Sequence, residues 1–464
     1  MTNDIYTMTT AAAALKDGAV TATKLAEDAI AAATAKDQDL GIYMLRFDDQ
    51  LLETAAKADA EFSAGGETPP MLGLPLGIKD IIATSEGETT AQSLVFDRGW
   101  GERQGDAEVV RRLRAHGALI AGKTTTMEFA TGIPDPSKPF PVPRNPWNPK
   151  HWTGGSSSGT GNGIVAGAML GGLGTDTGGS IRLPAAYCGI SGLKATFGRV
   201  PKSGCVPLGY SLDHIGPMAA SAADCALMLN SLAGANQADP TTQDEPVVDY
   251  LAALCGDVGG LRIGFDPLLE SNPDRESAVD EALAAAVTLF RAAGASVEAT
   301  RLPLYPEVAA ACRITSRCEA LSYHLPDLQS RWGDYFNSTR TGVASGAFFT
   351  GADYVQAQRV RRYAQKVAAD ELWSNYDLIL TPTTSTSAPA LADLLEGGWQ
   401  FSTTHTGYWN ALGNPALSVP MGFDSKGLPL SLQIVGRPFD EATVLRAGDT
   451  YQRGTAWHLA RPAA

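Results

Sequence analysis

Residues 151–163 read HWTGGSSSGTGNG and place three consecutive serines between glycines. A run of this kind is typical of a phosphate-binding loop, of a flexible linker, or of a loop that takes part in catalysis. A phosphate loop ends its glycine run with a lysine and then a serine or threonine, which this run does not contain. A linker does not fit either, because residues 164–200 are too apolar to remain in solvent. A structural turn and a catalytic loop are the interpretations that remain.

The serines match one hydrolase motif by themselves. Residues 155–159 fit GxSxG, which makes Ser157 a candidate nucleophile of an α/β-hydrolase elbow. That elbow follows a strand, whereas residues 145–153, NPWNPKHWT, are punctuated by proline and predict a loop. A second glycine–glycine–serine occurs in residues 174–184, GTDTGGSIRLP, where two glycines before Ser180 allow backbone N–H groups to turn toward one point. Two such motifs together favour a catalytic site over an ordinary turn.

The composition limits the class of protein. The chain has 464 residues, 44% of them hydrophobic, which is enough for one large α/β domain or two ordinary ones. A formal charge of −14 repels phosphate backbones and anionic lipids, so we expect no nucleic-acid partner. We expect no membrane span, because no apolar run of about 18 residues occurs. The six cysteines show no CxxC pair and no metal-ligand spacing, so we expect reduced thiols, a cytoplasmic location and a site without metal.

Strands and helices are predicted to alternate along the chain. Residues 9–35 and 47–64 are rich in alanine, with apolar residues at helical spacing, and predict an N-terminal helical layer. Residues 71–84 predict a strand, and residues 106–125 a helix, a glycine and a buried strand, as in a parallel βαβ unit. The alternation is expected to continue at 261–302, 376–383, 415–422 and 429–436, with a helix from about 441. This order predicts an α/β/α sandwich.

Residues 153–217 resemble the amidase signature family, whose defining stretch is GGSSxG followed by GTDxGGSxRxP. Further segments resemble that family in the same order: GLPLGIKD (73–80), GKTTTMEFATG (122–132), NPWNPKHWTGGSSSG (145–159), SLDHIGP (211–217) and GNPALSVPMG (413–422). The likeness covers most of the chain from about residue 70 onward. It implies a large mixed, mostly parallel central sheet covered by helices on both faces.

The resemblance also implies a single domain over residues 1–464. Residues 1–65 are expected to form its helical layer, residues 66–235 its catalytic core, and residues 236–464 the half that carries specificity. The polar stretch 236–248, NQADPTTQDEPVV, is predicted to be a loop at the last of these boundaries.

Three catalytic residues follow from the resemblance. The family's nucleophile falls on Ser180, its intermediate serine, which follows a cis peptide bond, on Ser156, and its lysine on Lys79. Ser156 is expected to relay the proton of Ser180 to Lys79, which must therefore be neutral. A free lysine has a pKa of about 10.4, but burial after the apolar run GLPLGI is predicted to lower the pKa of Lys79 to roughly 7 to 8. No metal or organic cofactor is needed for this chemistry.

The turn around the predicted nucleophile is expected to supply the rest of the site. Acyl transfer develops negative charge on the substrate oxygen, which backbone N–H groups stabilise. We expect these to be the N–H groups of Thr177, Gly178 and Gly179, together with that of the nucleophile itself. Asp176 and Arg182 flank the turn with opposite charges, and we expect an ion pair between them to hold it.

Two segments that line the acyl pocket in relatives, residues 127–134 and 397–410, carry apolar and aromatic side chains here. Those side chains are Met127, Phe129, Trp399, Phe401, Tyr408 and Trp409. Neither segment contains lysine or arginine, which favours an uncharged hydrophobic or aryl group over an amino acid. Met127, Phe129 and Trp409 are the residues predicted to bind the substrate, a small-molecule amide.

Within the family, the chain also resembles the glutaminase components of glutamyl-tRNA amidotransferases, which hydrolyse glutamine for their partner subunits. Two positions depart from them: Leu183 stands where glutamine is usual, and Thr403 aligns near the position where an acidic residue would bind the α-amino group of glutamine, a charge that threonine lacks. A stand-alone amidase for small hydrophobic or aryl amides is therefore the preferred function, and the glutaminase component of an amidotransferase is the alternative. The sequence does not decide the oligomeric state, and a homodimer is one option. His151 is predicted to be structural and not the base of a histidine triad.

Overall fold

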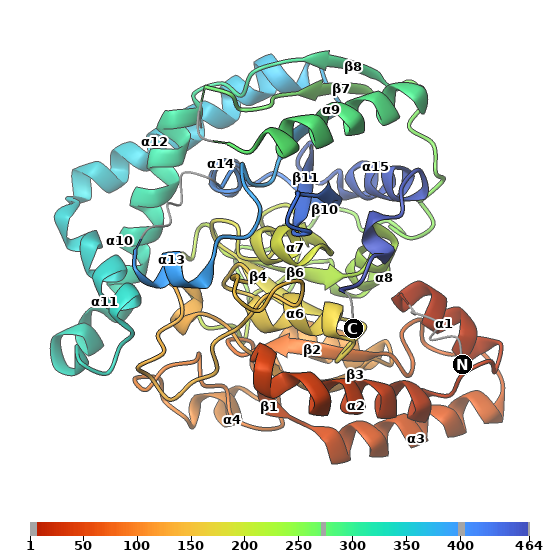
Figure 1. Cartoon of the computed structure of the whole chain (residues 1–464). Coiled ribbons are helices and arrows are strands. Elements are labelled where there is room, and N and C mark those ends of the chain that lie inside the picture. The colour runs from red at the N-terminus through yellow and green to blue at the C-terminus, as the bar shows by residue number, and fades with distance from the viewer. Residues whose placement is uncertain (1–6, 271–274, 398–403, 463–464) are drawn as a thin grey trace.

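The structure, a computed structural model, describes residues 7–270, 275–397 and 404–462. At its centre is an eleven-stranded sheet in the order β1-β3-β2-β4-β6-β5-β10-β11-β9-β7-β8. The strands are β1 (Tyr43–Arg46), β2 (Pro75–Lys79), β3 (Leu119–Thr124), β4 (Gly171–Asp176), β5 (Ser191–Lys194), β6 (His214–Ala219), β7 (Arg262–Phe265), β8 (Ser296–Ala299), β9 (Leu378–Pro382), β10 (Ala416–Phe423) and β11 (Pro429–Gly436). Strands from both sides of residues 236–248 join this sheet, which lies among helices (Figure 1). The predicted α/β fold is confirmed.

Strand direction differs from the expectation in one respect. Parallel pairing is confined to β3–β2–β4 and to β9–β7–β8. The other neighbouring pairs among the described strands are antiparallel. The sheet is mixed, as expected, but the prediction that it is mostly parallel is wrong. One antiparallel pair has a local cause, because a short turn at residues 424–428 joins β10 to β11, and a connection this short allows only antiparallel pairing.

A group of N-terminal helices lies toward the bottom of Figure 1. It consists of α1 (Met8–Lys16), α2 (Ala22–Leu40) and α3 (Asp48–Ala64). The alanine-rich residues 9–35 are divided between two helices, because the chain turns at Gly18, whose φ is +69°. Thr21 then caps α2 by accepting a hydrogen bond from the Lys24 amide.

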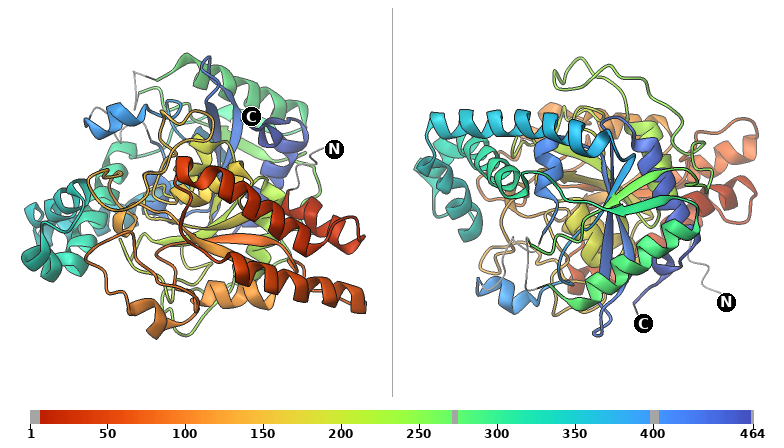
Figure 2. Two further views of the ribbon diagram at one scale, coloured as in Figure 1. Left: turned by 60° about the horizontal axis from the view of Figure 1, so that its bottom comes forward. Right: turned by 90° about the horizontal axis from the view of Figure 1, so that it is seen from above.

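Figure 2 shows helices on both sides of the twisted sheet. The helices that pack on the sheet or on a helix that covers it include α5 (Glu108–Ala115), α6 (Ser158–Ala166), α7 (Arg182–Cys188), α8 (Ala222–Leu232), α9 (Ser277–Ala292) and α15 (Glu441–Arg453). Shorter helices are α4 (Trp100–Gln104), α13 (Leu391–Leu395) and α14 (Gly407–Leu412). An extension at the left of Figure 1 contains α10 (Tyr305–Arg331), α11 (Asn337–Ala344) and α12 (Gly351–Ala368).

The centre of the sheet brings the predicted catalytic segments together. β2 and β4 are parallel neighbours, with Ile78 opposite Leu173, so their carboxyl ends lie side by side. Lys79 is the last residue of β2, and Asp176 is the last residue of β4. α6 begins directly after the serine loop and packs on both of these strands. The lysine, the serine loop and the turn after β4 therefore meet at one edge of the sheet, where parallel strands commonly form sites.

Candidate active site

Lys79 is buried at the end of β2, with an exposed fraction of 0%. Its Nζ lies 2.6 Å from Ser156 Oγ and 2.7 Å from Thr175 Oγ1. Burial disfavours the ammonium form and lowers the pKa of Lys79 to about 7, although nearby acidic groups, Asp176 among them, act in the opposite direction. A substantial fraction of the amine is therefore neutral near pH 7, and its lone pair lies within hydrogen-bond distance of a serine hydroxyl.

The three serines of the loop have different surroundings. Ser156 follows a cis peptide bond from Gly155 and is 2% exposed. Ser157 is fully buried, and its Oγ accepts a hydrogen bond from the Thr175 amide at 3.1 Å and donates one to the Thr175 carbonyl at 3.2 Å. Ser158 Oγ donates to the Gly154 carbonyl at 2.7 Å. The buried, doubly bonded hydroxyl of Ser157 does not fit the nucleophile of a GxSxG elbow, which must face substrate.

Ser180 lies in the turn between β4 and α7 and is partly exposed. Its carbonyl accepts a hydrogen bond from the Ser157 amide at 3.2 Å, which joins this turn to the serine loop. Exposure increases from Lys79 through Ser156 to Ser180. A substrate that approaches from solvent therefore meets Ser180 first, with the buried amine behind Ser156.

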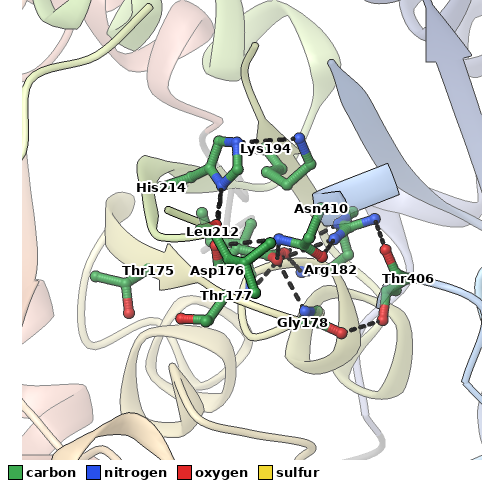
Figure 3. Close-up of polar contacts among 12 residues, drawn as sticks. Thr175, Asp176, Thr177, Gly178, Arg182, Lys194, Leu212, His214, Thr406 and Asn410 are labelled. Atoms are coloured by element: carbon green, nitrogen blue, oxygen red, sulfur yellow. Dashed lines mark hydrogen bonds and ion pairs between the residues drawn. The ribbon is translucent and has the colours of Figure 1, made fainter. Parts of the chain in front are cut away.

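The turn after β4 is held by a buried ion pair between Asp176 and Arg182 (Figure 3). Arg182 Nη2 and Nε each lie 2.9 Å from a different oxygen of the Asp176 carboxylate, and neither side chain has exposed surface. Burial alone would raise the pKa of Asp176, but the Arg182 charge and several hydrogen bonds hold it well below its usual range. The expected ion pair is thus present, inside the protein and not on its surface.

Gly179 does not have the role that the sequence predicts for it. Its N–H donates to Asp176 Oδ1 at 2.8 Å, because its φ of +137° directs the peptide back toward the end of β4. The amides of Thr177, Gly178 and Ser180, by contrast, take part in none of the hydrogen bonds found within residues 7–270, 275–397 and 404–462. These three N–H groups are the candidates for an oxyanion hole.

Three polar residues from the C-terminal half contact this turn and are not among the predicted site residues. Thr406 Oγ1 donates to the Gly178 carbonyl at 2.5 Å, and Asn410 Nδ2 donates to Asp176 Oδ1 at 2.8 Å. Gln433 Oε1 accepts a hydrogen bond from the guanidinium of the buried ion pair at 2.8 Å. Figure 3 shows the first two beside that ion pair. The sequence gives a signal for two of them, since Thr406 and Asn410 lie in residues 397–410, the segment assigned above to the acyl pocket, whereas no matched segment contains Gln433.

His214 and Lys194 lie above the turn in Figure 3 and are buried. His214 Nδ1 lies 2.6 Å from the Leu212 carbonyl, which assigns the proton to Nδ1, and Nε2 then accepts from Lys194 Nζ at 3.4 Å. Burial, reinforced by the Lys194 charge, holds the pKa of His214 well below its usual range. Both ring nitrogens are engaged away from Ser180, so this histidine is structural.

The residues predicted to bind substrate are buried. Met127, Phe129 and Trp409 have exposed fractions of 1%, 2% and 0%. Met127 packs beside Gly155 and so adjoins the serine loop. Phe129 and Trp409 belong to two separate hydrophobic core clusters, where large aromatic side chains stabilise the fold by burial, and neither is among the residues that line the cavity described below. Trp399, Phe401 and Thr403 lie outside the described residues.

A cavity of about 150 Å³ lies beside the turn and is not predicted by the sequence. Thr175, which contacts Lys79, and Thr177 form one wall. The rest of the lining is largely apolar, with polar groups that include the side chains of Lys202 and Asp213. The apolar part consists of Ile81, Ala130, Val206, Pro207, Leu208 and Ile215.

The backbone of His151 bonds to residues outside the proposed relay. Its backbone bridges to Ala390, its amide donates to the Asn148 carbonyl, and its carbonyl accepts from the Asn145 amide. Among the described residues, no group of three or more His, Cys, Asp or Glu side chains is placed to hold a metal ion. In the same part of the chain, no helix has the length and apolar character needed to cross a bilayer.

Comparisons with known proteins agree with the resemblance seen in the sequence. Residues 24–445 match the family model described as Amidase. The chain is 37% identical to the A-type subunit of the glutamyl-tRNA(Gln) amidotransferase of Chloroflexus aggregans, over 98% of both chains. It resembles the solved structure of a peptide amidase from Stenotrophomonas maltophilia, at 28% identity, a TM-score of 0.84 and 98% coverage of both chains. It also resembles a protein from a vestigial complex connected with the evolutionary origins of an s-triazine catabolic enzyme, at 29% identity, a TM-score of 0.89 and coverage of 99% and 100%.

Proposed function

Because the chain belongs to the amidase signature family, whose members are hydrolases that act on amides, we propose that it hydrolyses small carboxamides through a covalent acyl-enzyme on Ser180. The observation that carries this proposal is the state of Lys79, an amine that is buried, has its pKa lowered to about 7 and lies 2.6 Å from Ser156 Oγ. We also propose that residues 1–464 form one domain, in which residues 1–65 are a helical layer, residues 66–235 the catalytic core and residues 236–464 the half that carries specificity.

In the first step, Ser180 Oγ attacks the carbon of the amide. Its proton passes to Ser156 Oγ while the proton of Ser156 passes to Lys79 Nζ, and the carbonyl oxygen becomes an oxyanion. The amides of Thr177, Gly178 and Ser180 stabilise that charge, and removal of one such donor typically costs roughly 10²- to 10³-fold in kcat. The C–N bond then breaks, and the amine leaves with the proton that returns from Lys79 through Ser156.

In the second step, water attacks the ester carbon of the acyl-enzyme. The Ser156–Lys79 pair accepts a proton from this water, and the oxyanion forms again in the same group of amides. Collapse of the intermediate breaks the bond to Ser180 Oγ, which takes back the proton, and the carboxylic acid is released. One proton relay thus serves both steps, and no step uses a group from outside the chain except substrate and water.

We propose that the acyl or leaving group of the substrate is hydrophobic or aromatic. Support comes from the cavity beside Thr175 and Thr177, whose apolar lining includes Ile81, Val206 and Leu208. Removal of apolar substrate surface from water contributes roughly 25 cal/mol per Å². A phenyl ring in such a place therefore stabilises the bound state more than a methyl group does.

The glutaminase component of an amidotransferase is the second candidate function. It is favoured by the relative of 37% identity from Chloroflexus aggregans, which the chain matches over 98% of both lengths. Against it stands Leu183, a buried apolar side chain at a position where those proteins usually have glutamine. If the chain is such a glutaminase component, partner subunits receive the ammonia that it releases from glutamine.

A hydrolysis panel with the purified chain distinguishes the two functions. Initial rates of ammonia or amine release are measured for glutamine, acetamide, benzamide and an anilide, together with an ester of the same aryl acid. We expect the aryl substrates to exceed acetamide in kcat/KM by about one to two orders of magnitude, and to exceed glutamine as well. Efficient release from glutamine with none from aryl substrates would favour the amidotransferase role, and no release from any of them would refute the stand-alone amidase function.

A further inference from the structure

The peptide between Gly178 and Gly179 is held at both ends. Thr406 Oγ1 donates a hydrogen bond to the Gly178 carbonyl at 2.5 Å (Figure 3). At the other end, the Gly179 N–H donates one to Asp176 Oδ1 at 2.8 Å. A peptide between two glycines rotates easily, because neither neighbour has a Cβ that would restrict it. These two hydrogen bonds therefore decide which way its carbonyl points.

Thr406 is itself fixed and inaccessible. It has an exposed fraction of 0%, and its own carbonyl accepts a hydrogen bond from Arg182 Nη1 at 3.0 Å. A Cβ placed on Gly179 would lie 2.9 Å from the Thr406 Cβ, so the threonine packs directly against the turn. With no exposed surface, Thr406 is excluded from contact with substrate and can act only through the turn.

The peptide groups on either side of the Gly178–Gly179 peptide carry the N–H groups of Gly178 and Ser180. Both of these N–H groups are candidates for the oxyanion hole. We infer that Thr406 is a positioning residue for that hole, because its hydroxyl keeps the intervening peptide from rotating and so keeps these two N–H groups directed at the substrate oxygen. Rotation would instead turn the Gly178 carbonyl toward the site, beside the developing negative charge. The inference rests on the proposed function, and it makes the C-terminal half part of the transition-state machinery.

The test compares three variants of the whole chain with wild type. Thr406→Val keeps the shape of the side chain and removes its hydroxyl, whereas Thr406→Ser keeps the hydroxyl. Thr383→Val is the matched control, because Thr383 is equally buried but its hydroxyl contacts Ser418 and Ser431 and not the turn. For each variant we measure the melting temperature, kcat and KM for an aryl amide, and the affinity for an aryl trifluoromethyl ketone, to which Ser180 adds to form an oxyanion.

We expect Thr406→Val to lower kcat by about 10- to 100-fold, somewhat less than the loss of a donor, with KM changed by less than about threefold. Affinity for the ketone should fall by the same factor as kcat/KM, and the pH midpoint of activity should not move. Thr406→Ser and Thr383→Val should remain within about threefold of wild type in both measurements. If Thr406→Val does not fold, Thr406→Cys, a weak donor of similar size, takes its place with the same expectation.

Two results overturn the inference alone. One is a folded Thr406→Val enzyme that keeps wild-type kcat and ketone affinity; the other is a Thr406→Ser enzyme as impaired as Thr406→Val. A wild-type chain that cleaves no amide and does not bind the ketone would instead refute the proposed function, and this inference with it.

Discussion

The protonation of the Lys79 amine decides whether the proposed site can act. Below its pKa of about 7 the amine carries a proton and cannot accept another from Ser156, and above it the amine is neutral. We predict that kcat/KM for an uncharged aryl amide rises about tenfold per pH unit below that pKa and levels off above it. Rates measured from about pH 5 to about pH 9 check this prediction. An acid limb that disappears in His151→Ala would contradict it.

Stability should depend on the same amine. The pKa of Lys79 is about 7 in the folded chain, below its ordinary value of 10.5, so between these values the unfolded chain binds more protons. The contribution of Lys79 to folding stability therefore increases as the pH rises through this window and is least favourable below it. We predict that Lys79→Met, which is also inactive, is stabilised relative to wild type most strongly below pH 7, and that the difference falls toward higher pH.

Denaturant unfolding of both proteins at several pH values measures this difference. The control is Lys57→Met, whose side chain is 71% exposed and should show no such trend. A free-energy difference between Lys79→Met and wild type that does not change with pH would show that Lys79 is not buried as a neutral amine.

The turn between β4 and α7 depends on groups outside itself. Arg182 neutralises the buried Asp176 carboxylate and also donates to Asn410 Oδ1 at 2.6 Å. We predict that Arg182→Met lowers the free energy of unfolding by about 3–5 kcal/mol, because it leaves a buried charge without its partner. Urea denaturation measures the loss. Arg301→Met removes a solvent-exposed ion pair with Glu270 and should leave the midpoint unchanged; equal losses in both variants would contradict the central role of the buried pair.

Most elements can be predicted from local pattern, and the exceptions have physical causes. Residues 71–84 predict one long strand, but β2 ends at Lys79, because the amides of Ile81 and Ile82 turn back to bond the Lys79 carbonyl. Apolar residues on both sides of the turn are equally buried, so hydrophobicity does not show where the strand ends. Strand direction also differs from the prediction, since it depends on which strands become neighbours and not on the composition of each one.

At the scale of the whole molecule, the site combines parts that are far apart in the sequence. The serines and the lysine proposed for catalysis are recognised from their motifs, because the residues next to them are typical of the family. Thr406, Asn410 and Gln433 cannot, because they reach the turn only through the arrangement of β10, β11 and α14 in the C-terminal half. Phe129 and Trp409 pack in hydrophobic core clusters, which the sequence does not show, because an aromatic side chain looks the same in a sequence whether it lines a pocket or fills a core.

We predict that the chain is active on aryl amides when purified alone. The groups proposed for chemistry, from Lys79 to Thr406, all belong to one polypeptide, and their contacts are made within it. Size-exclusion chromatography coupled to an activity assay tests this, with the active fraction expected to contain only this chain as a monomer or a homodimer. Activity that appears only after two further subunits are added, and only with glutamine, would point to the amidotransferase role.

The central claim is that Ser180 carries the acyl group, with Ser156 and Lys79 as its proton relay. The most direct measurement is mass spectrometry of the protein quenched during turnover of an aryl ester, followed by peptide mapping of the added acyl mass. We predict that the acyl group is found on Ser180 in wild type and in Ser157→Ala, and is absent in Ser180→Ala. An acyl group on Ser157, or acylation that persists in Ser180→Ala, would contradict the claim.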